Sequence, residues 1–161
     1  FALEGAAKSL GVRAQAHLKL DTGMNRIGVR TPEELKELLE AARECPHVSL
    51  CGAMTHFATA DVPGSDFARE QLERYEAMLA VLSAYGLKVT RHAAASAAAE
   101  RYPQARYDMV RAGISMYGAD PLDRLPVRPA MRWTTQVVHV KPLHAGATVS
   151  YGRRFTAQGE R

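Results

Sequence analysis

The sequence predicts an α/β fold: the C-terminal half of a (β/α)8 TIM-like barrel, followed by the start of a β-rich C-terminal domain. Three observations predict it. Apolar runs of strand length are each followed by a helical pattern over most of residues 12–111. No hairpin turn joins these strands, so parallel strands with right-handed crossovers are expected. After Pro121 the periodicity ends, and a stretch rich in β-forming residues follows a proline-containing linker.

The first predicted strand leads directly into a polar loop. Residues 16–20 alternate between apolar and polar side chains, which is typical of a strand with one buried face. A glycine-bearing turn follows at residues 21–23. The next helix starts at residues 31–34, with a capping hydroxyl, a proline in the first turn and a glutamate placed to reach back. Lys19, Asp21 and Arg26 are therefore expected at the strand-end edge where parallel α/β proteins bind ligands.

The other elements of this part follow from periodicity and from glycine and proline stops. In order, we expect a helix over residues 1–11 that ends at Gly11, helix 32–44, strand 48–54, helix 65–85, strand 87–92, a short helix over 93–100 and strand 107–111.

The last part of the chain has a different texture. Three prolines mark a linker without periodicity, and two runs of β-forming residues, 130–141 and 147–156, flank a turn. We therefore predict a domain boundary near residue 125. Residues 1–125 would form the half-barrel, and residues 126–161 would begin a β domain.

The composition is that of an ordinary globular protein. Of the 161 residues, 47% are hydrophobic and 24% charged, and the net charge of +4 comes from basic residues spread along the chain. Neither a nucleic-acid nor a membrane partner is expected. Cys45 and Cys51 have the spacing of neither a zinc pair nor a redox pair, so we expect reduced thiols, no metal and a cytoplasmic location. Both ends of the chain look cut, as in an internal piece of a longer protein.

Several polar residues follow predicted strands and could carry chemistry. The guanidinium of Arg26 could bind a carboxylate through two parallel hydrogen bonds, although an arginine in such a loop often only covers the surface. His56 could stack on an aromatic cofactor or simply hydrogen-bond nearby backbone. Ser96 opens a short helix, where it could bind phosphate or act as an ordinary N-cap. Tyr151 would by itself be interpreted as a half-buried strand tyrosine.

Four short motifs together resemble alanine racemases, the pyridoxal-phosphate enzymes that interconvert L- and D-alanine. The run HLKLDTGMNRIGVR (residues 17–30) is similar to the corresponding segment of that family. THFATAD (55–61), RAGI (111–114) and SYG (150–152) follow in the family's order. The resemblance covers nearly all of residues 12–158. It implies a homodimeric racemase that uses two-base proton transfer at the α carbon and supplies D-alanine for peptidoglycan.

The resemblance also implies roles on the substrate side of the site. Arg26 would face the substrate carboxylate and the phenolic oxygen of pyridoxal phosphate. Lys19 would be the lysine that is often carbamylated to hold that arginine; a lowered pKa of the buried amine would permit this. Asp61 could line the substrate entrance. Tyr151 would be the second catalytic base, entering the site of the partner subunit, with its pKa lowered through His56 and Arg111.

On the cofactor side, the resemblance implies that His56 packs against the pyridoxal ring. Ser96 and the backbone amides of Gly113 and Ile114 would bind the phosphate. The family usually has asparagine before this serine, and Ala95 stands there instead. Arg111 would donate to the pyridine nitrogen, which keeps that nitrogen unprotonated and weakens the ring as an electron sink.

The chain lacks the motif of one required residue, and several alternative functions stay open. Pyridoxal-phosphate chemistry needs a Schiff-base lysine, and no segment of this chain resembles the family's lysine motif. We therefore expect an active whole protein and an inactive chain alone. Alternatives are a related racemase for serine or another small amino acid, and a non-catalytic pyridoxal-phosphate-binding protein. Asp21-Thr22-Gly23 is also the aspartic protease triplet, but only one copy occurs and long helices flank it.

Overall fold

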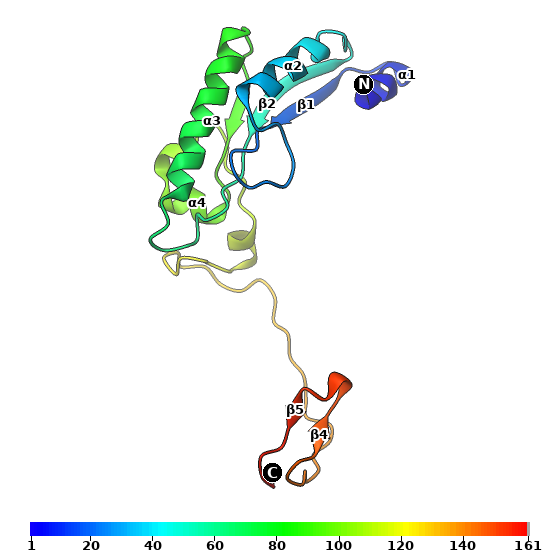
Figure 1. The fold of residues 1–161 in the computed structure, drawn as a ribbon, viewed down its shortest axis with the longest axis vertical. Coiled ribbons are helices and arrows are strands. Elements are labelled where there is room, and N and C mark those ends of the chain that lie inside the picture. Colours follow the sequence, from blue (N-terminus) through cyan, green and yellow to red (C-terminus); the bar gives the residue numbers. More distant parts are fainter. Residues whose placement is uncertain (161) are drawn as a thin grey trace. The chain divides into compact units, whose positions relative to one another are not determined.

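The computed structural model describes residues 1–160. It divides into two compact units, the first over residues 1–130 and the second from Met131 onward. Figure 1 shows the helices and the parallel strands of the first unit and a small hairpin in the second. The two units are described separately below, and the predicted boundary near residue 125 stays a prediction.

The first unit repeats strand and helix in the predicted order. Its three strands form one parallel sheet in the order β1-β2-β3. Its elements are α1 (Ala2–Ser9), β1 (Ala14–Lys19), α2 (Pro32–Ala42), β2 (Val48–Met54), α3 (Phe67–Ala84), β3 (Thr90–His92), α4 (Ser96–Arg101) and the 3₁₀ turns η1 (Pro103–Ala105) and η2 (Ile114–Tyr117). The α/β fold class is confirmed.

The start of α2 confirms the predicted cap with one difference. The Thr31 hydroxyl accepts a hydrogen bond from the Glu34 amide at 3.1 Å, and Pro32 occupies the first helical position. The Glu34 carboxylate reaches one residue beyond the cap and accepts from the Arg30 amide at 2.6 Å. Backbone donors at this helix end are therefore satisfied, which positions the end of the preceding loop.

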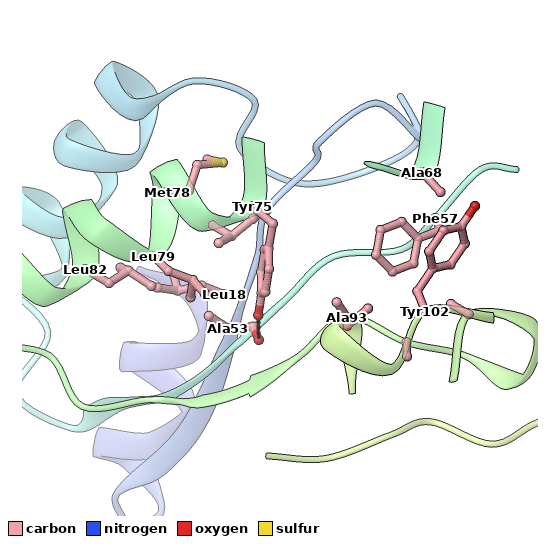
Figure 2. Close-up of a cluster of buried hydrophobic side chains, with 14 of the residues drawn as sticks. Leu18, Ala53, Phe57, Ala68, Tyr75, Met78, Leu79, Leu82, Ala93 and Tyr102 are labelled. Atoms are coloured by element: carbon pink, nitrogen blue, oxygen red, sulfur yellow. Dashed lines mark hydrogen bonds between the residues drawn. The ribbon is translucent and has the colours of Figure 1, made fainter. Parts of the chain in front are cut away.

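Alternation along β1 separates a core face from a polar face. Leu18 joins the buried core with Ala53 of β2 and with the apolar face of α3, and Figure 2 shows these side chains together. On α3 that face consists of Tyr75, Met78, Leu79 and Leu82. His17 and Lys19 occupy the alternate positions of β1 and therefore point to the opposite face of the sheet.

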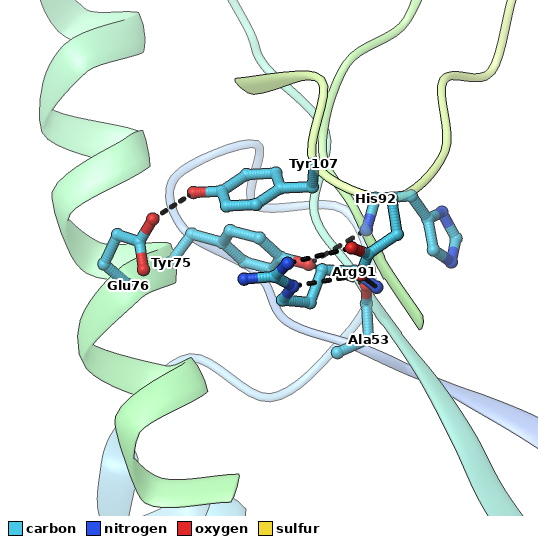
Figure 3. A network of polar contacts seen from close by, with 7 residues as sticks. Ala53, Tyr75, Glu76, Arg91, His92 and Tyr107 are labelled. Atoms are coloured by element: carbon cyan, nitrogen blue, oxygen red, sulfur yellow. Dashed lines mark hydrogen bonds and ion pairs between the residues drawn. The ribbon is translucent and has the colours of Figure 1, made fainter. Parts of the chain in front are cut away.

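Tyr75 joins the second and third strands from the helix side. Its hydroxyl donates to the Ala53 carbonyl at 2.6 Å and accepts from the His92 amide at 3.2 Å, as Figure 3 shows. Burial raises the pKa of Tyr75 to about 12. Figure 3 also shows Tyr107, whose hydroxyl donates to the Glu76 carboxylate at 2.5 Å. Tyr75 thus places the backbone of His92 at the end of β3.

Two strand predictions in the first unit need correction. The third strand begins only at Thr90, not at residue 87. The predicted strand 107–111 is absent and is reduced to a single parallel bridge between Ala95 and Arg111. Tyr107 has φ +46°, outside the extended region, and the Asp108 carboxylate accepts from the Arg91 amide at 2.8 Å. The Asp108 side chain therefore accepts from the backbone amide of Arg91, which would otherwise be available to the backbone of a neighbouring strand.

The second unit also departs from its prediction. The run 130–141 forms no strand, and its valines are exposed: 82% for Val137 and 93% for Val138. A strand requires a hydrogen-bonded neighbour, and no described residue pairs with this run. The run 147–156 is a hairpin of β4 (Thr148–Val149) and β5 (Phe155–Thr156), not one strand. Positive φ at Ser150 (+57°) and Gly152 (+71°) reverses the chain through η3 (Tyr151–Arg153).

No helix in the described part of the chain combines the length and the hydropathy needed to cross a bilayer. Cys45 and Cys51 are both free thiols, as expected.

Candidate active site

The carboxyl ends of the three parallel strands lie at one edge of the sheet. The loop after β1 carries Arg26, the loop after β2 carries His56, and the segment after β3 leads into α4 at Ser96. Open parallel sheets bind ligands at this edge because loops that leave neighbouring strands converge there. The predicted site residues of the first unit are therefore placed by the sheet itself.

Asp21 holds the loop after β1. Its carboxylate is 4% exposed and accepts hydrogen bonds from the backbone amides of Gly23 (3.0 Å), Asn25 (2.9 Å) and Arg26 (3.0 Å). Burial by itself would raise the pKa of Asp21, but these amide donors outweigh it and hold the pKa below its usual value. The Arg26 side chain is exposed. The loop therefore fixes the backbone of Arg26 and leaves its guanidinium free to meet a ligand.

Lys19 carries a buried amine without a partner. Its Nζ is shielded from solvent and makes no hydrogen bond to any described residue. Burial lowers the pKa of Lys19, and the nearby charges of Arg111 and Arg26 lower it further against the opposing effect of Asp21. Gly28 packs directly on this lysine, since a Cβ there would lie 2.5 Å from the Lys19 carbonyl oxygen. An amine in this setting is shifted toward its neutral, nucleophilic form.

Four acceptors within 3.1 Å, all on the strand-end segments, hold Arg111. One terminal nitrogen donates to the His92 carbonyl at 2.8 Å and lies 3.0 Å from His92 Nδ1. The other donates to the carbonyls of Thr55 at 2.7 Å and Ala93 at 3.1 Å. The guanidinium makes no ion pair with any described carboxylate, and its Nε–H donates to no described residue. Burial lowers the pKa of Arg111, but a guanidinium stays charged at neutral pH.

His56 faces this arginine. Its Nδ1 lies 3.4 Å from a terminal nitrogen of Arg111. Burial lowers the pKa of His56, and the charges of Arg111, Lys19 and Arg26 lower it further. The imidazole is therefore neutral at pH 7. Because Arg111 can only donate, Nδ1 is the acceptor and the proton of His56 is assigned to Nε2.

Arg111 also contacts His92, which in turn contacts His17. These two histidines were not identified from the sequence as site residues. His92 Nδ1 accepts from Arg111, so its Nε2–H donates to His17 Nδ1 at 2.7 Å. Burial, with the charge of Arg111, lowers the pKa of His92 to about 4. Gly52 makes room for the pair, since a Cβ there would lie 2.4 Å from the His17 ring. The alternation that places His17 on the same face as Lys19 was the available signal.

A cavity of about 470 Å³ lies beside this network, within the size range of small-molecule sites. All five residues that the resemblance assigns to the cofactor line it, together with Asp61: His56, Ser96, Arg111, Gly113 and Ile114.

Ser96 is not an N-cap in this structure. Ala95 is the N-cap residue of α4, and the Ser96 hydroxyl accepts from the amides of Gly113 at 3.1 Å and Ser115 at 3.4 Å. The hydroxyl proton of Ser96 and the amide of Ile114 donate to no described residue. Two donors thus remain beside the cavity. The Gly113 amide, in contrast, is already used to tie its loop to Ser96.

Two predicted residues on the substrate side, Lys19 and Arg26, do not line this cavity. Arg26 lines a separate hollow of about 330 Å³ with Asp21 and Asn25. Tyr151 lies in the second unit, at the turn between β4 and β5, where its side chain is 98% exposed.

Comparison with known proteins gives consistent results. The sequence profile described as "Alanine racemase, N-terminal domain" matches residues 1–121. An alanine racemase from Chlorobaculum tepidum is 47% identical over 97% of this chain. The structure of alanine racemase from Streptomyces coelicolor is 36% identical and matches 99% of this chain with a TM-score of 0.83. An alanine racemase from Bartonella henselae, described with covalently bound pyridoxal phosphate, matches with a TM-score of 0.72; at 21% identity it shows the fold alone.

The chain spans less than half the length of these relatives. It covers 42% of the Chlorobaculum protein and 44% of each of the two structures.

Proposed function

The chain belongs to the family of alanine racemase N-terminal domains, and we propose that the whole protein is a pyridoxal-phosphate-dependent racemase that interconverts L- and D-alanine. The observation that carries the proposal is the cavity of about 470 Å³ lined by His56 after β2, by Ser96 at the start of α4 and by Arg111, which bridges to Ala95. Relatives named alanine racemase support the reaction. When bound, pyridoxal phosphate supplies an electron-withdrawing ring that stabilises the charge left by removal of the α-proton.

Arg111 fits the proposed contact with the ring nitrogen. Its four bonds to carbonyls and to His92 fix the guanidinium, and its Nε–H stays available as a donor. A permanently charged donor leaves the ring nitrogen unprotonated. Arg111 would in this way favour racemisation over transamination, because its charge would keep the bound group a weaker electron sink.

The segment from Ser96 to Ile114 fits the phosphate. The Ser96 hydroxyl can donate to an anion because its oxygen already accepts from Gly113 and Ser115. The Ile114 amide adds a backbone donor at the same cavity. Ala95, in place of the family's usual asparagine, supplies no side-chain donor.

On the substrate side we propose that Arg26 binds the amino-acid carboxylate. An exposed guanidinium on a loop fixed by Asp21 can form two parallel hydrogen bonds to a carboxylate. Lys19 is proposed as a carbamylated residue, because its buried, unpartnered Nζ and lowered pKa favour reaction of the neutral amine with carbon dioxide. Carbamylation would replace the Lys19 amine with a negatively charged group near Arg26.

Tyr151 is proposed as the second base, acting on the α-proton in the site of the partner subunit of a homodimer. His56 and Arg111 are the proposed hydrogen-bond relay to its phenolic oxygen. We further propose that the enzyme is cytoplasmic and supplies D-alanine for peptidoglycan. The Schiff-base lysine is proposed to lie outside residues 1–161, so this chain alone is expected to be inactive.

The test is racemisation by the full-length protein with added pyridoxal phosphate. Chiral chromatography after incubation with L-alanine should show D-alanine, and incubation with L-serine should show slower conversion. Faster conversion of serine would assign the related serine racemase. Binding of pyridoxal phosphate without conversion of either amino acid would favour the non-catalytic binding protein and contradict the proposal.

A further inference from the structure

Gln71 is a fully buried polar residue on α3 that no prediction included. Its side chain is 0% exposed, and it reaches from the helix to both loops of the site. Nε2 donates to the His56 carbonyl at 3.1 Å and to the Thr22 hydroxyl at 3.3 Å. Oε1 accepts from the Ala58 amide at 2.8 Å. Both amide protons and one lone-pair direction of the oxygen are therefore used.

The backbone determines the orientation of this amide. The Ala58 N–H can only donate and the His56 carbonyl can only accept. A flipped side chain would set nitrogen against N–H and oxygen against carbonyl, with no hydrogen bond at either. Glutamine therefore fits this place through its donor and its acceptor together, and an isosteric carboxylate would face the His56 carbonyl with a second acceptor.

The bonds of Gln71 lead to both sides of the cavity. The Gln71 amide hydrogen-bonds to the backbone of His56 and of Ala58, the residues on either side of Phe57. These two bonds fix the backbone from which the His56 side chain projects. Through Thr22 it reaches the Thr55 hydroxyl, 2.7 Å from the Thr22 hydroxyl. The Thr55 carbonyl accepts from Arg111 at 2.7 Å. Helix α3, which does not line the cavity, is thus connected to both His56 and Arg111.

We propose that Gln71 is a positioning residue that holds His56 against Arg111 and couples the loop after β1 to the loop after β2. The part of this inference that concerns catalysis rests on the proposed function; the part that concerns His56 does not. A misplacement of about 1 Å in such a site can cost about a hundredfold in rate.

The first test follows His56 itself in the cofactor-free, full-length protein. Histidine labelled with ¹³C at Cε1 allows its titration to be followed by NMR. In Gln71→Met and Gln71→Glu, the imidazole should be less buried and farther from Arg111, so its pKa should move upward toward the ordinary value. Leu82→Ala is the control: Leu82 is also buried on α3, and its side chain is apolar. That variant should lower the thermal midpoint without moving the titration of His56.

The second test is kinetic. With pyridoxal phosphate bound, Gln71→Met should lower kcat by about tenfold to a hundredfold with a smaller change in KM for alanine. Leu82→Ala should keep the kcat of the wild type. An unchanged His56 titration in a folded Gln71→Met protein would overturn the proposal, as would equal losses of kcat in Gln71→Met and Leu82→Ala. If the wild type racemises nothing, the proposed function fails, and the His56 titration still decides the role of Gln71.

Discussion

Arg111 and Arg26 both lie near the carboxyl ends of strands in the same sheet, but the structure holds them in opposite ways. Arg111 is half-buried, and four acceptors fix its guanidinium. Arg26 is exposed, and only its backbone is fixed, through Asp21. The difference indicates that Arg111 is preorganised as a donor, whereas the Arg26 side chain would become ordered only on binding a ligand.

The largest effect is expected from Arg111→Glu in the full-length protein. A carboxylate would face the carbonyls of Thr55, His92 and Ala93 and would hold the ring nitrogen protonated. Racemisation should fall by about a thousandfold, while transamination to pyruvate should rise relative to it. Chiral chromatography and a pyruvate assay measure the two. Arg30→Glu, a change of an exposed arginine, is the control and should alter neither rate. An unchanged ratio of transamination to racemisation in Arg111→Glu would contradict the role of Arg111.

Tyr151→Phe tests whether Tyr151, which belongs to the second unit, acts as the second base. Loss of a general base typically costs at least about a hundredfold. Because the equilibrium constant of a racemisation is one, the overall rates must fall in both directions. The asymmetry should appear in exchange of the α-hydrogen with deuterated solvent, which should be lost for one enantiomer and kept for the other. Equal loss of exchange from both enantiomers would argue against two separate bases.

A smaller effect is expected from Arg26→Lys. An ammonium keeps the charge but loses the pair of parallel hydrogen bonds to a carboxylate. KM for alanine should rise by about tenfold with a smaller change in kcat, because the lost contact stabilises substrate and transition state alike. Arg30→Lys serves as the matched control. An unchanged KM would show that Arg26 does not bind the substrate carboxylate.

The smallest effect concerns the stability of the loop that carries Arg26. Asn in place of Asp21 would turn an amide donor toward the Arg26 or Asn25 N–H and cost about 1–3 kcal/mol at pH 7. The folded-state pKa of Asp21 is lowered from 3.8, so its stabilisation is present above that pH and disappears as the pH falls through the lower, folded value. Urea unfolding of wild type and Asp21→Asn should therefore differ at pH 7 and converge in acid. A constant difference would show that charge is not involved.

Periodicity and caps allow most of the first unit to be predicted. The alternation in β1, the Thr31 cap and the apolar face of α3 each depend on residues close in sequence. The run 130–141 shows the limit, because β-propensity produces a strand only where another strand offers hydrogen bonds.

The site, too, has a part that the sequence predicts and a part that it does not. Motifs identify the residues that line the cavity, although their roles stay predictions. Gln71 could not have been found in this way, and the sequence places Asp21 at the strand end without showing that it holds the loop. Their functions depend on which amides and carbonyls the fold places opposite them, and only the three-dimensional structure shows those partners.

Loops that leave neighbouring strands are proposed to build one phosphate-bearing cofactor site, and the affinity for pyridoxal phosphate is the decisive measurement. Titration of the full-length protein, followed by visible absorbance, should give about tenfold weaker binding for Ser96→Ala, the loss of one charge-assisted hydrogen bond. Ser9→Ala, an exposed serine on α1, should bind like the wild type. Equal affinity in all three proteins would contradict the account.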